Sequence, residues 1–228
     1  MFLNFATISF IATLLSFATS VTAHPTANLI REPKDSPRFA GAILSESTYD
    51  RVTSTFVIPK FGPNNSTVPD GTQYLNAVVG LQCTQAVRIY AFVGFSISPD
   101  GGVYVSALGP VPPAVSFNVG ETARITVEVA NNGYNATVEN LTSGNATHGH
   151  MPSAIPPTCN TTVWGIEGPN SRPFVGSIIF FNTFARPANG LPEVGPGGAT
   201  IQNIVTPNGA NLTSTYITSS PGITISYL

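Results

Sequence analysis

The sequence predicts an all-β protein, and three observations support this fold class. Short runs rich in Val, Ile, Thr, Phe and Tyr recur along the chain, and their apolar residues follow the two-residue alternation of strands. Turns such as Asp100-Gly101-Gly102 and Asn132-Gly133 separate these runs at the spacing of antiparallel hairpins. Beyond the first residues, no segment has a sustained apolar period of 3.6 residues. An antiparallel sandwich or barrel accounts for all three observations.

The expected strands follow one another along the chain. Seven runs have the alternation and the length of single strands. They are Thr53–Ile58, Val87–Ile97, Val103–Leu108, Ala123–Val129, Ala136–Glu139, Gly176–Phe181 and Ile223–Tyr227. Proline-rich stretches predict irregular connections at Gly62–Thr72, Thr147–Pro157 and Ala185–Gly198.

The first residues predict export from the cell. Phe2–Leu15 is an apolar run too short to span a bilayer, and Val21-Thr22-Ala23 resembles a small-residue cleavage site. We therefore expect residues 1–23 to be a signal peptide, 24–37 a short lead-in or the remnant of a pro-segment, and 38–228 one folded domain. No second apolar segment of transmembrane length follows. These features predict a secreted, extracellular protein without a membrane span.

Cysteines and glycosylation sequons agree with an extracellular address. The chain has two cysteines, Cys83 and Cys159, and an oxidising compartment favours a disulfide between them over two free buried thiols. A disulfide that closes the loop between Cys83 and Cys159 would stabilise the fold by about 4 kcal/mol on the chain-entropy estimate. Seven asparagines begin an Asn-x-Ser/Thr triplet and are candidate glycosylation sites: Asn64, Asn65, Asn135, Asn140, Asn145, Asn160 and Asn211.

The charge of the chain is sparse, with 9% of Asp, Glu, Lys and Arg and a net charge of −2. Without a basic cluster, the sequence has no footprint for nucleic acid or for an anionic membrane. His148 and His150 lie two residues apart, but without a nearby third ligand they are weak evidence for a metal. We expect no metal or cofactor, and a monomer that binds an unidentified protein, peptide or glycan.

One carboxylate is placed where it could do chemistry. The run Val163–Glu167 ends a predicted strand just before a Gly-Pro-Asn turn. Alternation places Trp164 and Ile166 on the core face and Glu167 on the opposite face, beside a glycine that leaves space above the sheet. A glutamate in this position is a candidate general base. The alternative is a structural carboxylate that is bonded to turn amides or paired with Arg172.

Several segments resemble, in order, the fungal glutamic peptidases, the eqolisins. Arg38–Leu44 and Val52–Pro59 are similar to their opening strands, and Val138–Gly144 matches their Leu-Glu-Asn-Leu-Thr-Thr-Gly hairpin at nearly every position. Cys159 followed by Trp164–Glu167 resembles the stretch that holds their catalytic glutamate. The similarity runs from about residue 38 to residue 228. It implies a concanavalin-like sandwich of two antiparallel sheets, which agrees with the all-β prediction.

The resemblance also implies a catalytic pair, of which one member is replaced. In the family, a glutamate acts as general base and a glutamine on a neighbouring strand stabilises the oxyanion. Glu167 falls on the glutamate position. The glutamine belongs six residues after the cysteine, and counting from Cys83 places Ile89 there. Losing one oxyanion donor typically costs about 10²–10³ in rate.

Other groove positions of the family are replaced too. Its groove Trp and Glu become Ala107 and Gly109, and the Trp of its Ala-Trp-Val-Gly segment becomes Val78. We expect small, apolar residues of two strands to face Glu167, and burial among them to raise its pKa. The residues expected on this face are Ile89, Ala91, Val93 and Phe95 on one strand and Val103, Val105, Ala107 and Gly109 on the other.

Three functions are consistent with the sequence. The first is a secreted glutamic-peptidase-like protein that keeps Glu167, lacks the glutamine and binds a ligand as an inactive pseudo-enzyme. The second is an active acid endopeptidase with Glu167 as base and Gln82 or Gln85 as oxyanion partner. The third is a lectin-like glycan binder, suggested by sandwich architecture alone, although the sole tryptophan, Trp164, is predicted to face the core. Whether the chain is an enzyme depends on the side chains around Glu167.

Overall fold

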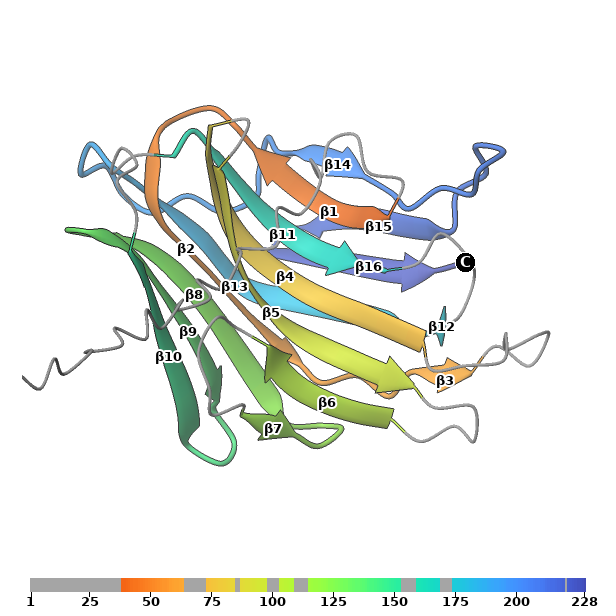
Figure 1. Cartoon of the computed structure of the whole chain (residues 1–228). Coiled ribbons are helices and arrows are strands. Elements are labelled where there is room, and N and C mark those ends of the chain that lie inside the picture. Colours follow the sequence, from red (N-terminus) through yellow and green to blue (C-terminus); the bar gives the residue numbers. More distant parts are fainter. Residues whose placement is uncertain are drawn as a thin grey trace, which may run out of the picture.

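The computed structural model describes residues 38–63, 73–84, 87–97, 103–108, 115–152, 159–168, 174–219 and 221–228, and all regular elements in these ranges are strands. Two seven-stranded antiparallel sheets form the layers of a sandwich (Figure 1). The predicted all-β sandwich is therefore confirmed. No helix in this part of the chain is long and apolar enough to cross a membrane. The predicted signal peptide and lead-in lie outside the described residues.

The first sheet brings strands from both ends of the chain together. Its strand order is β14-β1-β11-β4-β5-β6-β7, so that β11 lies between β1 and β4. The bounds in that order are Thr200–Gln202, Phe39–Leu44, Thr161–Glu167, Gln73–Thr84, Val87–Ile97, Val103–Leu108 and Ser116–Phe117. Strands β5 and β6 have the bounds that alternation predicts.

The second sheet forms the other layer, with the strand order β10-β9-β8-β2-β13-β16-β15. The bounds in that order are Asn145–Pro152, Gly133–Asn140, Thr122–Ala130, Tyr49–Val57, Ser177–Pro187, Gly222–Tyr227 and Thr213–Thr218. Two short strands, β3 (Gly62–Pro63) and β12 (Phe174–Val175), pair separately.

The core between the sheets is apolar because alternate residues of each strand point into it. Trp164 of β11 is fully buried there, and its indole N–H donates a 3.1 Å hydrogen bond to the carbonyl oxygen of Thr53 in β2. Phe56 of β2 and Phe180 of β13 pack with their ring centroids 5.2 Å apart. The Trp164 hydrogen bond links the two layers and satisfies the one polar atom of this side chain.

The prediction of an irregular connection at Thr147–Pro157 is wrong for its first part. Its first part belongs to β10, which pairs with β9 from Asn145 opposite Asn140 to Pro152 opposite Gly133. Proline lacks the N–H of a ladder, but Pro152 ends an edge strand, where this loss is tolerated. The predicted connection at Ala185–Gly198 likewise begins inside β13, which ends at Pro187. Proline content alone was therefore a poor guide to where these strands end.

The disulfide between Cys83 and Cys159 is formed and closes a loop of 76 residues, as predicted. Cys83 lies near the end of β4, and Cys159 lies two residues before β11 begins. The backbone of Cys159 also exchanges two hydrogen bonds with Tyr49, of 2.6 and 3.1 Å. The covalent link thus joins two neighbouring strands of the first sheet at the end remote from Glu167.

Asn140 organises the turn between β9 and β10. Its side chain is 2% exposed, and its Oδ1 atom accepts hydrogen bonds from the backbone N–H groups of Thr142 and Ser143, at 3.0 and 3.1 Å. Its Nδ2 atom donates to Glu121 at 2.8 Å and to the carbonyl oxygen of Ser116 at 3.2 Å. All the polar atoms of this side chain are therefore used inside the fold.

Replacing Asn140 tests this account of the turn. We expect Asn140→Ala to lower the free energy of unfolding by about 2–3 kcal/mol, because this buried side chain makes four hydrogen bonds that alanine cannot replace. Asn145→Ala is the matched control, since Asn145 is exposed, and we expect it to change stability by less than about 0.5 kcal/mol. Urea unfolding measures both, and equal effects of the two variants would contradict the role of Asn140.

The contacts of Asn140 also indicate which of the glycosylation sequons can carry a glycan. A glycan on Asn140 would replace a hydrogen on the Nδ2 atom that donates to Glu121 and Ser116, so we expect this sequon to be unmodified. Asn145, Asn160 and Asn211 are exposed and can carry a glycan. Peptide mass spectrometry after enzymatic deglycosylation measures occupancy, and a modified Asn140 in folded protein would contradict the prediction. Asn64 and Asn65 lie outside the described residues.

Candidate functional site

Strand β11 presents Glu167 on the outer face of the first sheet. Trp164 and Ile166 belong to the core between the sheets, whereas Val163 belongs to a separate apolar cluster on the other face. Glu167 is two alternations further along β11 than Val163, so its side chain shares that outer face. It is half-buried at the last position of the strand. The predicted facing of these residues is confirmed.

The neighbours of Glu167 across the sheet differ from those expected. Glu167 pairs with Phe39 of β1 on one side and with Asn76 of β4 on the other, and Asn76 pairs in turn with Gly94 of β5. Residues directly opposite in antiparallel strands have Cβ atoms about 4.5–5.5 Å apart and point to the same face. The Asn76 side chain therefore places a carboxamide beside Glu167. Asn76 was not predicted, because its position beside Glu167 depends on the pairing of β4 with β11, which are far apart in the sequence.

The prediction that apolar residues of β5 line the face of Glu167 is wrong. Ile89, like Ala91, Val93 and Phe95 after it, lies in the core between the sheets, on the face opposite to Glu167. The residues of β5 on the outer face are the alternate ones, and they include Arg88, Tyr90 and Phe92. The error has a local cause, since the count from Cys83 crosses a hairpin with a register shift between Gln82 and Thr84. One residue of shift exchanges the two faces.

The other predicted site residues are scattered. Gln82 is on the outer face, but it pairs with Thr161, six residues from Glu167 along β11, which is about 20 Å at strand rise. Val78 lies in the outer apolar cluster, as its alignment with a groove position suggests. The backbone of Ala107 pairs with Val93, a core residue. Gln85 and Gly109, as well as Arg172, lie outside the described residues.

The surface beside Glu167 is built by two aromatic rings that lie over glycines. A Cβ atom at Gly165 or at Gly41 would lie 2.7 or 2.8 Å from the Phe39 Cζ atom, so this ring covers both positions. The ring of Tyr90 covers Gly80 of β4 in the same way. Together with Val78 and Val163 among others, these two rings form the outer apolar cluster. The absence of side chains at these glycines lets the two rings approach the sheet closely.

Burial is the main influence on the charge of this site. It raises the pKa of Glu167, and the positive charges of Arg38 and Arg88 oppose this rise only in part. Burial also raises the pKa of the Tyr90 hydroxyl, where Arg88 acts in the opposite direction and Glu167 adds to the rise. The upward direction for Glu167 agrees with the sequence-based expectation. The surroundings differ from those expected, because Phe39 rather than Ile89 lies beside Glu167 on the outer face.

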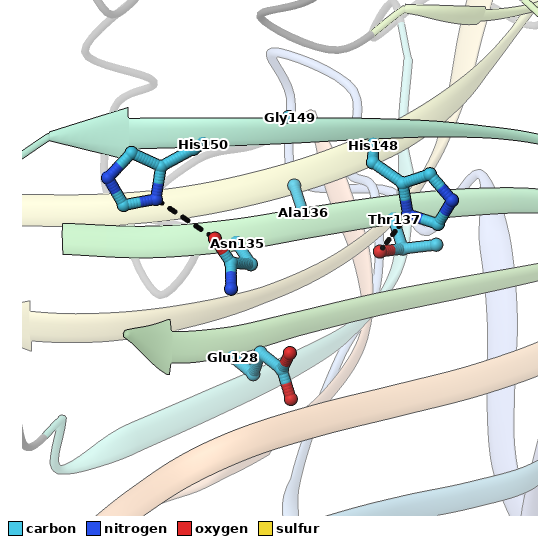
Figure 2. Close-up of a pocket in the computed structure, with 7 residues that line it drawn as sticks. All are labelled: Glu128, Asn135, Ala136, Thr137, His148, Gly149 and His150. Carbon is cyan, nitrogen blue, oxygen red and sulfur yellow. Dashed lines mark hydrogen bonds between the residues drawn. The ribbon is translucent and has the colours of Figure 1, made fainter. Parts of the chain in front are cut away.

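A hollow of about 370 Å³ lies over β8, β9 and β10, away from Glu167 (Figure 2). Two imidazoles line it: the Nδ1 atom of His150 lies 2.9 Å from Asn135 Oδ1, and that of His148 lies 3.1 Å from Thr137 Oγ1. Within the described ranges, no three His, Cys, Asp or Glu residues come close enough together to hold a metal ion. The histidines therefore make cross-strand polar pairs, and Glu167 remains the best candidate for chemistry.

The fold and this site can be compared with known proteins. The model of the Peptidase A4 family matches residues 37–227. The chain belongs to the Peptidase A4 family. No match was found among curated proteins.

Solved structures of eqolisins share the fold of this Peptidase A4 member. SCP-B, a member of the Eqolisin family of peptidases solved with the tripeptide Ala-Ile-His, superposes with a TM-score of 0.63 at 21% identity. Scytalido-glutamic peptidase, solved with a transition state analog inhibitor, superposes with a TM-score of 0.61 at 20% identity. Each match covers 84% of this chain and 98% of the other. The eqolisin resemblance and the sandwich fold it implied are confirmed.

The raised pKa of Glu167 predicts a pH-dependent stability. The pKa of Glu167 is higher in the folded than in the unfolded state, so binding of a proton to this carboxylate stabilises the fold. This stabilisation is complete below the unfolded pKa, and it is lost as the pH rises through the folded pKa. The neutral variant Glu167→Gln should therefore be more stable than the wild type at about pH 7, with the difference shrinking at about pH 3. Urea unfolding at both pH values measures this change.

The exposed residue Glu193 provides the control for this comparison. Glu193→Gln removes a carboxylate of similar size from a solvent-accessible ion pair with Arg51, and we expect little gain at either pH. A carboxyl resonance of Glu167 that titrates below the ordinary range of glutamate would contradict the desolvated site.

Proposed function

We propose that this Peptidase A4 member is a secreted protein whose outer face around Glu167 binds an extended peptide without cleaving it efficiently. The observation that carries the proposal is the identity of the outward residues of β5. On the outer face, toward which the family glutamine would point, this strand presents Arg88, Tyr90 and Phe92. The base Glu167 thus receives no carboxamide from this strand.

The chemistry of peptide hydrolysis supports a large loss of activity. A general base can activate water, but the negative charge that develops on the carbonyl oxygen needs a donor placed for the transition state. Removing one such donor costs about 10²–10³ in rate. Misplacing the substrate costs more, because orientation contributes several further kcal/mol in well-ordered sites. The replacement of a groove tryptophan by Val78 removes one aromatic contact that could have oriented a substrate.

A peptide is the ligand class that the surroundings favour. The outer face that carries Glu167 also carries the aromatic rings of Phe39 and Tyr90, and apolar surface of this kind suits side chains of an extended segment. The related SCP-B was solved with the tripeptide Ala-Ile-His, which makes this tripeptide a suitable probe. The lectin-like alternative gains no support from Trp164, because this side chain is fully buried in the core.

One observation favours an active acid endopeptidase as a second candidate. Asn76 lies directly opposite Glu167 and carries a carboxamide, one methylene shorter than that of a glutamine. It replaces Gln82 as the amide to test, since Gln82 lies about 20 Å away along the strand.

An assay of hydrolysis separates the two candidates. We expect the purified protein to degrade denatured protein between about pH 2 and 5 at least about 100-fold more slowly than scytalido-glutamic peptidase, because the oxyanion donor is replaced. Calorimetric titration with Ala-Ile-His should show binding by the same preparation.

Variants of the outer face make this assay decisive. Robust acid proteolysis that is lost in both Glu167→Gln and Asn76→Leu, but kept in Gln82→Leu, would overturn the proposal of an inactive protein. It would identify Asn76 as the oxyanion partner of Glu167. Gln82→Leu is the matched control because it removes a carboxamide from the same face far from Glu167.

A further inference from the structure

A buried hydroxyl group on the outer face of the first sheet has no assigned role. Tyr90 of β5 is opposite Gly80 of β4, and Gly80 is opposite Val163 of β11, so Tyr90 lies on the same face as Glu167. A Cβ atom at Gly80 would overlap the edge of the Tyr90 ring. The ring therefore leans from β5 across β4, in the direction of the strand that carries Glu167.

The hydroxyl of Tyr90 has no hydrogen-bond partner in the part of the chain that the structure describes. The residue is 9% exposed, and none of the described residues bonds to its oxygen. Its packing neighbours on this face are apolar and include Val78, Val163 and Phe92, none of which has a side-chain acceptor. Buried tyrosine hydroxyls nearly always have a partner, and an acceptor atom of a ligand on this face would supply one.

The electrostatic surroundings decide which kind of atom fits. Burial raises the pKa of Tyr90 and outweighs the opposing charge of Arg88, and the Glu167 carboxyl adds a smaller rise. The phenol consequently keeps its proton and acts as a donor. A ligand carboxylate would have to lie beside Glu167, whereas a main-chain carbonyl is a neutral acceptor that an apolar face accommodates.

We propose that the Tyr90 hydroxyl donates a hydrogen bond to a main-chain carbonyl oxygen of the bound peptide and so positions the peptide beside Glu167. This inference rests on the proposed function, in which the outer face binds a peptide. Tyr90 then provides a donor on the same strand where the family resemblance expects a carboxamide. The apolar cluster around it excludes water and strengthens the bond.

The variant Tyr90→Phe removes the hydroxyl and keeps the ring. We expect it to bind Ala-Ile-His about tenfold more weakly in calorimetry, the usual effect of one hydrogen bond at a dry site. The melting temperature of the ligand-free protein should stay the same or rise, because an unpartnered polar atom is removed. Tyr216→Phe is the control, since Tyr216 is 53% exposed on the second sheet, and neither quantity should change.

A second probe tests the acceptor. Replacing each peptide bond of the tripeptide in turn by a trans-alkene removes one carbonyl oxygen while keeping the shape. One replacement should weaken binding to the wild type about tenfold and binding to Tyr90→Phe much less, because the variant has no bond left to lose.

Other results would overturn the proposal. A lower melting temperature with unchanged affinity would mean that the hydroxyl has an internal structural role. Equal affinities of Tyr90→Phe, Tyr216→Phe and the wild type would exclude Tyr90 as the donor while leaving peptide binding intact. A wild-type protein that binds no peptide would overturn both the proposed function and this inference.

Discussion

The position of Trp164 is the constraint on which the candidate site depends. Its ring is fully buried between the sheets, and its N–H bonds to the Thr53 carbonyl in the opposite layer. Because side chains alternate strictly along a strand, this anchor also fixes where every other residue of β11 points. A slip of one residue would expose the indole and bury the Glu167 carboxylate in the core. Packing on one side of the sheet thus determines chemistry on the other.

The protonation of Glu167 is decided by packing more than by its charged neighbours. Arg38 and Arg88 both favour the ionised carboxylate, yet burial outweighs them and the pKa rises. Attraction between partly solvated charges is weakened by water, whereas the loss of hydration is not compensated at an apolar surface. Phe39 and Tyr90 can approach so closely only because glycines lie beneath them. The glycines of the sheet therefore contribute indirectly to the raised pKa of Glu167.

Features that depend on one strand alone could be predicted from the sequence, whereas features that depend on the pairing of strands could not. The facing of Trp164 and Glu167 could be predicted because alternation within one strand needs no knowledge of its partners. The face of Ile89 was predicted wrongly because the count passed through a hairpin with a register shift. Asn76 could not be found at all, since its proximity to Glu167 depends on the pairing of β4 with β11, which are far apart in the sequence. Pairing between distant strands is set by the whole core.

The late arrival of β11 has a consequence for the nascent chain. Strands β1, β4 and β5 leave the ribosome well before β11, which must then enter between β1 and β4. Until it does, both of these strands have open edges with unpaired N–H and C=O groups, which are prone to pair with other chains. A truncated or stalled product that ends before residue 161 would keep Tyr90 and Asn76 but would be liable to aggregate. The strand that carries Glu167 therefore also protects the growing chain from association.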